Sequence, residues 1–100
     1  MNAPTGDWGA DDIPVRAAAV RAAFLDGEAV LYGIEQGRSV LLNESAAAVW
    51  AAIDGQSTVR EISADLADLH GVDRPTVIGD VIASLSVFET LRLVSRILVV

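Results

Sequence analysis

The hydrophobic pattern of this chain changes its period once, near Asn43, and that change decides the class of fold. Before Asn43 the apolar residues form short runs separated by turn signals at Asp26-Gly27 and at Gly37. Such runs are typical of antiparallel strands. After Asn43 the apolar residues recur every three or four positions, as they do along one face of a helix. Strands followed by helices, rather than alternating with them, predict an α+β domain.

The first half predicts a three-stranded antiparallel sheet, with strands at about residues 17–25, 28–32 and 38–42. Three helices follow, at about residues 44–53, 59–70 and 74–91. Thr58 and Glu61 form a capping box, and Pro75 lies in a first turn, where its missing N–H costs little. Asn43 and Asp73 can cap the other two helices. A three-stranded antiparallel sheet followed by three helices predicts a winged helix-turn-helix-like architecture.

The two ends of the chain carry weaker signals. We expect residues 1–14, rich in Pro, Gly and Asp, to be a flexible acidic tail, followed by one domain over residues 15–94. The alternative is a docking arm anchored by Trp8. We expect residues 95–100 to be an apolar C-terminal tail. A short strand, or an oligomer contact that makes a homodimer, is an open alternative for the stretch from Leu93 onwards.

Charge and hydropathy exclude several partners. Seven arginines oppose fourteen acidic residues in the 100-residue chain. Residues 44–89 alone carry eight acids and two arginines, a net charge of −6, which disfavours nucleic acid and anionic membranes. The N-terminus lacks a basic flank and an apolar stretch, so it does not resemble a signal peptide. The longest uncharged apolar run, 46–53, is far below the ~20 residues of a membrane helix. We therefore expect a cytoplasmic protein.

Side chains capable of catalysis are few. The chain has no Cys and one His, so we expect neither a thiol nucleophile nor a metal site. His70 ends a predicted helix, where its charge favours the dipole. Asp65 and Asp68 lie on a solvated helix face without a partner base. The sequence therefore predicts no enzyme and no cofactor.

The third predicted helix suggests a binding surface. Its apolar residues spread over roughly half of the helix circumference, wider than the ~100° that faces a single core. One interpretation is a helix wedged between the sheet and the other helices. The other is that one flank lines an open groove, with Asp80 and Ser84 as its polar lip.

Taken in order, several segments resemble the pyrroloquinoline quinone biosynthesis protein D family. They are DGEAVLY at 26–32, GRSVLLNESAAAVW at 37–50, DG at 54–55, TVREI at 58–62, GVD at 71–73 and DV at 80–81. The resemblance covers about residues 20–94. Two positions depart from it, since Gly33-Ile34 stands where members often carry Asp-Pro, and Arg92 where they often carry Gly. We expect the first to alter the hairpin and the second the end of the third helix.

The resemblance implies a recognition element for ribosomally made, post-translationally modified peptides. In that family the leader of a precursor adds as a strand to the edge of the sheet and enters a groove beside the third helix. The modifying enzyme would be a radical SAM enzyme, a leader peptidase or a cyclase of natural product biosynthesis. An exposed edge strand suits such a role, because its unpaired backbone groups can bind an extended peptide.

Carried over residue by residue, the resemblance implies a specific site. It assigns the backbone ladder to Arg38, Ser39, Val40, Leu41, Leu42 and Asn43, and the groove to Val77, Val81, Ser84 and Leu85, with Asp80 as partner of a basic leader residue. Two alternatives to this peptide chaperone remain. One is a winged-helix transcription regulator, and the other is a small subunit that only stabilises a biosynthetic enzyme.

Overall fold

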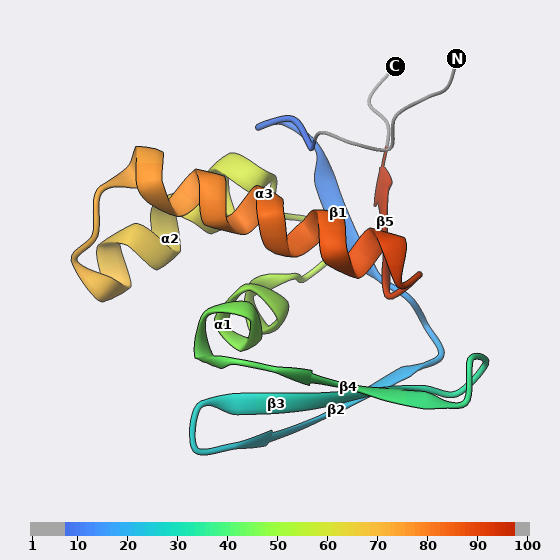
Figure 1. Ribbon diagram of the computed structural model, residues 1–100. Helices are drawn as coiled ribbons and strands as arrows, with labels where there is room; N and C mark the ends of the chain where they lie inside the picture. Colours follow the sequence, from blue (N-terminus) through green and yellow to red (C-terminus); the bar gives the residue numbers. More distant parts are fainter. Residues whose placement is uncertain (1–7, 98–100) are drawn as a thin grey trace.

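The computed structural model describes residues 8–97, which form three helices and five strands (Figure 1). In chain order they are β1 (Ile13–Arg16), β2 (Val20–Leu25), β3 (Glu28–Gly33), β4 (Arg38–Leu42), α1 (Glu44–Ala52), α2 (Val59–His70), α3 (Arg74–Thr90) and β5 (Val94–Ile97). The α+β class, the three-stranded antiparallel sheet and the three helices that follow it confirm the predicted fold. Within residues 8–97, no helix has the length and apolar composition to cross a bilayer.

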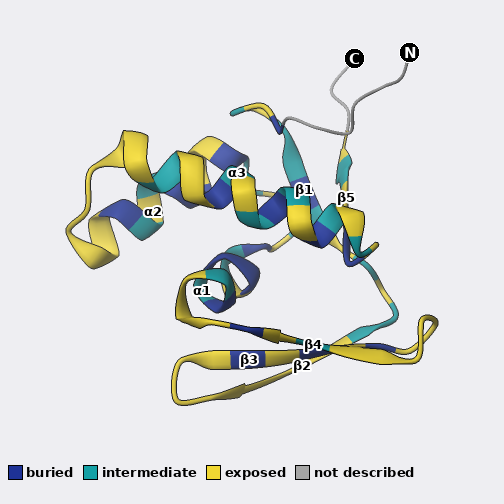
Figure 2. Ribbon diagram, in the orientation of Figure 1, coloured by how far each residue is buried: buried dark blue, intermediate teal, exposed yellow. Residues whose placement is uncertain are grey.

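The three-stranded sheet has the order β2-β3-β4 and lies beneath α1 (Figure 1). Asp26 and Gly27 link β2 to β3 with φ angles of 53° and 83°, the positive values that a tight hairpin requires. One face of the sheet is buried against the helices through Ala29, Leu31 and Leu42. The alternate residues of β3 point to the opposite face and are exposed (Figure 2).

The helices begin where the sequence predicts, because each has a local cap. The side chains of Asn43 and Asp73 accept hydrogen bonds from the first turns of α1 and α3. The reciprocal capping box of Thr58 and Glu61 is present at the start of α2. The apolar faces of the helices meet around Trp50, whose ring contacts that of Phe88 edge to face at a centroid distance of 5.5 Å. This buried contact joins α1 to α3.

The segment before β2 differs from the flexible tail expected up to residue 14. The side chain of Trp8 is 2% exposed, and β1 pairs with β5 in an antiparallel ribbon. Backbone carbonyls of Ala10 and Asp12 also accept hydrogen bonds from the first turn of α2. The expectation is therefore wrong for residues 8–14, which belong to the domain, and residues 1–7 lie outside the described range.

The C-terminal stretch forms the short strand left open as an alternative. Residues 95–97 pair with β1 in place of the expected apolar tail, and residues 98–100 lie outside the described range. Neither strand of this pair carries a local signal, since each has four residues and its partner lies at the other end of the chain. Strands from opposite ends of the described range, β1 and β5, thus lie side by side in one ribbon (Figure 1).

Arg96 of β5 locks this ribbon to its surroundings. Its guanidinium lies 4.1 Å from the centroid of the Trp8 ring. It also binds Glu89 of α3 at 2.7 Å and Asp12 at 3.2 Å. The hydrogen bonds that Arg96 donates to Glu89, together with the charges of the Glu89 and Asp12 carboxylates, raise the pKa of Arg96 above its usual value despite partial burial. One side chain thus joins the N-terminal segment, α3 and β5.

Arg92 turns the chain between α3 and β5. Its φ angle is 62°, in the left-handed region that favours glycine, and the following Leu93 N–H donates to the carbonyl of Phe88. This is the position where family members often carry Gly, so the chain keeps the turn and accepts a strained residue in it. The turn between β3 and β4 ends at Gly37, which has a φ of 67°.

Candidate functional site

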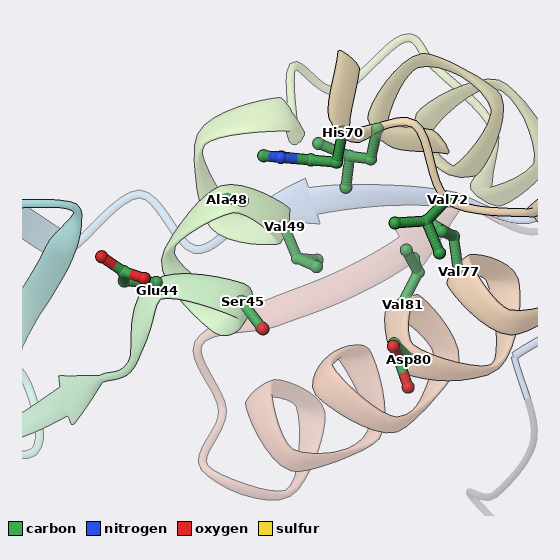
Figure 3. Close-up of a pocket in the computed structure, with 10 residues that line it drawn as sticks. Glu44, Ser45, Ala48, Val49, His70, Val72, Val77, Asp80 and Val81 are labelled. Atoms are coloured by element: carbon green, nitrogen blue, oxygen red, sulfur yellow. The ribbon is translucent and has the colours of Figure 1, made fainter. Parts of the chain in front are cut away.

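A pocket lined by residues of the described part of the chain lies between the three helices (Figure 3). It has a volume of about 270 Å³. One wall is α1, the opposite wall is the first half of α3, and the C-terminal end of α2 closes one side. The lining residues are Glu44, Ser45, Ala48, Val49, Leu66, His70, Val72, Val77, Asp80 and Val81.

The pocket has an apolar floor and a polar rim. Val49 and Val81 are buried and form its base. Ser45 and Asp80 lie together on one side of the opening, with His70 across from them (Figure 3). The volume is below the ~300–1,000 Å³ of sites for drug-sized ligands. Its size and its lining suit an apolar side chain of a peptide, with polar contacts at the rim.

Glu44 lines the same pocket but its carboxylate points away from the other lining side chains (Figure 3). It lies against the turn between β2 and β3, where a Cβ on Gly27 would be 3.0 Å from its Oε2 atom. The acidic charge at the opening therefore comes from Asp80.

Local capping fixes the wall formed by α3. Asp73 accepts hydrogen bonds from the Thr76 hydroxyl at 2.8 Å and from the Thr76 N–H at 3.1 Å. These bonds lower the pKa of the Asp73 carboxyl. Pro75 follows in the first turn. The first turn is thus set before Val77 and Asp80, which project from the next turns of the helix.

The outer edge of β4 is unpaired in the described structure, and its backbone groups can be assigned. The Ile34 N–H donates towards β2, to the carbonyl of Ala19, whereas the Gly33 carbonyl accepts from Gly37 on the β4 side. Because backbone groups along a strand point alternately to its two sides, Gly33, Leu31 and Ala29 face β4. Their partners there are Arg38, Val40 and Leu42. The N–H and C=O groups of Ser39 and Leu41 therefore face the open edge.

The structure separates the residues assigned to the peptide ladder. Arg38, Val40 and Leu42 direct their backbone groups into the sheet. Asn43 is engaged in capping, since its side chain accepts from the Ala46 N–H and its carbonyl from the Ala47 N–H. Ser39 and Leu41 alone among the six combine a strand conformation with outward backbone groups.

Of the residues assigned to the groove, some line the pocket and others do not. Val77, Asp80 and Val81 line the pocket. Leu85 is fully buried in the core, and Ser84 does not line the pocket. The walls from α1 and α2 were missed by sequence reasoning. Ala48 could not be assigned to the pocket from the sequence, because alanine occurs on both buried and exposed helix faces. His70 was interpreted as a helix-end residue.

The family of this chain follows from its sequence. Residues 28–94, about two thirds of the chain, match the family described as Coenzyme PQQ synthesis protein D (PqqD). The chain therefore belongs to the PqqD family, which confirms the resemblance drawn from its motifs. No curated protein matches the chain.

Two solved structures are similar to it. One is the PqqD truncation of Methylobacterium extorquens PqqCD, described as a functional and stand-alone recognition element for ribosomally synthesized and post-translationally modified peptides. It has 26% sequence identity and a TM-score of 0.76, covering 89% of this chain and 95% of that one. The other is TbiB1 in complex with the TbiA(beta) leader peptide, with 26% identity and a TM-score of 0.73, covering 81% and 94%.

Proposed function

We propose that this protein is a non-catalytic recognition element that binds the leader of a ribosomally made precursor peptide and delivers it to a modifying enzyme. The observation that carries the proposal is the open edge of β4, where Ser39 and Leu41 present unpaired backbone groups. An extended peptide can bond to such an edge while alternate side chains enter pockets. The similar TbiB1 was solved with a leader peptide, which supports the same role here.

The leader would add beside β4 as a fourth strand. Its backbone would exchange hydrogen bonds with Ser39 and Leu41, at every second position of β4. The pocket opens at Ser45, two residues beyond the cap of α1, so a peptide that continues past the end of β4 reaches it. An apolar leader side chain would fill the pocket, and Asp80 would pair with a basic neighbour.

The modifying enzyme would be a radical SAM enzyme, a leader peptidase or a cyclase. The domain supplies recognition to that enzyme and takes no part in the chemical step. The encounter would take place in the cytoplasm, where the precursor is synthesised. The net charge of −6 over residues 44–89 argues against a DNA-binding role for the same fold.

Two proline variants test the edge. Ser39→Pro removes an outward N–H and should leave the sheet intact, whereas Val40→Pro removes a bond to β3 and should disrupt the fold. Losing one such bond costs about 0.5–1.5 kcal/mol. Together with the steric effect of the ring, Ser39→Pro should weaken leader binding by about tenfold or more. Binding is measured by calorimetric titration with a synthetic peptide of the cognate leader sequence, and folding by circular dichroism.

Two leucine variants test the pocket. Ala48→Leu fills the space between α1 and α3 and should weaken leader binding. Ala83→Leu makes the same change at an exposed position of α3 outside the pocket and should leave binding unchanged. If folded Ser39→Pro and Ala48→Leu proteins both bind the leader as well as wild type, the proposed site is wrong.

A further inference from the structure

The face of the three-stranded sheet turned away from the helices carries a continuous apolar patch. The register places Ala23, Val30 and Leu41 side by side across the three strands, with Leu25 and Tyr32 in the flanking rows. Leu25 is 75% exposed, Leu41 70% and Tyr32 44%. We call these five residues the outer patch. Single exposed apolar residues are ordinary, but a contiguous set marks an interaction surface.

Nothing in residues 8–97 covers the outer patch. All three helices lie on the other side of the sheet, with α1 packed against β3 and β4 (Figure 1), and the residues of β3 that alternate with its buried ones are exposed. The β1–β5 ribbon is a separate sheet. The patch is therefore open to another chain.

Charge at the two ends of the outer patch identifies the partner. Arg21 lies in the row of Tyr32, and Glu28 lies in the row of Leu25, about 13 Å away along the strands. Both side chains are exposed, and neither forms an ion pair within the described residues. The patch thus has a positive end and a negative end with apolar residues between them. If a second copy of the patch is turned end to end, its negative end faces the positive end of the first.

We propose that the outer patch binds a second copy of this chain. A twofold axis between two such faces, perpendicular to the strands, brings the Arg21 end of each copy over the Glu28 end of the other. Closed twofold contacts of this kind use the same surface on both subunits. Sheets that pack face to face in a sandwich keep their strands aligned within about 30°.

The contact leaves the peptide-binding features free. Both β4 edges lie at the side of the sandwich, and both helical pockets lie on its outer layers. One dimer would therefore carry two peptides, and the dimer contact does not depend on the peptide-binding proposal. The patch is small, so we expect a weak dimer that forms at high protein concentration.

Sedimentation equilibrium over a concentration series tests the dimer, with two glutamate variants of equal exposure. Leu25→Glu places a charge in the outer patch and should raise the dimer dissociation constant by about tenfold or more. Leu69→Glu changes a residue of α2 that is also 75% exposed and should leave it unchanged. Arg21→Glu and Glu28→Arg should each weaken the dimer, and the double variant should restore it. Circular dichroism confirms folding, and calorimetry should show unchanged leader binding by Leu25→Glu.

Three results would overturn the proposal. One is a wild-type chain that stays monomeric at about 1 mM. The second is a dimer that Leu25→Glu leaves intact. The third is a dimer lost in a folded Ala22→Pro variant and unaffected by the charge swaps. Since the N–H of Ala22 faces the free edge of β2, that result would place the contact at the edge instead of the face.

Discussion

The two sheets of this protein use the same antiparallel pairing and differ in what surrounds them. The β1–β5 ribbon is held by side chains from three parts of the chain, including the Arg96 to Asp12 contact that spans 84 positions. The β2–β4 sheet buries one face and leaves its other face and the β4 edge open. Long-range side-chain contacts therefore hold the ribbon, whereas the three-stranded sheet keeps one face exposed. Substitutions in the two regions should have different consequences.

Removing Trp8 should have the largest effect on stability. Trp8→Ala takes a 2% exposed side chain out of the core and leaves Arg96 without its aromatic partner, so it should cost about 3–5 kcal/mol. Tyr32→Ala, on the open face of the other sheet, should cost about 1 kcal/mol or less. Urea unfolding measures both. Equal costs would remove the distinction between the two regions.

Replacing Arg96 should have an intermediate effect. Arg96→Met keeps much of the side-chain volume but removes the charge that pairs with Asp12 and Glu89. The loss of these bonds and of the contact with the Trp8 ring should cost about 1–3 kcal/mol. Arg21→Met, on the exposed sheet face, should change stability by less than about 0.5 kcal/mol in dilute solution. Thermal unfolding of both variants provides the comparison. An unchanged unfolding midpoint for Arg96→Met would contradict the claim that Arg96 stabilises the β1–β5 ribbon.

Changing Arg92 should have the smallest effect, with the opposite sign. Arg92→Gly relieves a side chain held at a φ angle of 62° and should stabilise the ribbon by about 0.5–1 kcal/mol. Asp26→Gly relaxes a similar angle in the open sheet, where φ is 53°, but should gain less because Asp tolerates this conformation well. A destabilised Arg92→Gly variant would mean that the arginine makes a contact worth more than the strain.

Local signals explain what the sequence could predict. The Asp26-Gly27 turn, the capping box of Thr58 and Glu61, and Pro75 after its Asp73 cap each act within a few residues. They therefore define strands β2 to β4 and all three helices without knowledge of the tertiary structure. The same locality explains the family motifs, which follow these turns and caps.

Distance along the chain explains what could not be predicted. Pairing of Ile13 with Ile97 depends on residues at opposite ends of the sequence, and four residues with a proline do not predict a strand. Trp8 is buried in a core that includes residues far along the chain, and it contacts Arg96 near the other end of the sequence. The direction of the β4 backbone groups depends on the hydrogen bond from Ile34 to Ala19, which no side-chain pattern encodes. The pocket could not be predicted because the sequence does not show that Ala48 of α1 lines the same space as residues of α3.

The open edge of β4 is also robust to mutation in a way that the pocket is not. The N–H and C=O groups of Ser39 and Leu41 are present in every amino acid, apart from the N–H that proline lacks. Almost any substitution at these two positions preserves them, whereas each change at Ala48 or Asp80 alters the shape or charge of the pocket. The sequence of the edge can therefore change widely while the same backbone groups remain available. Divergence between paralogues should then appear as a change in which side chain is accepted, on an unchanged backbone frame.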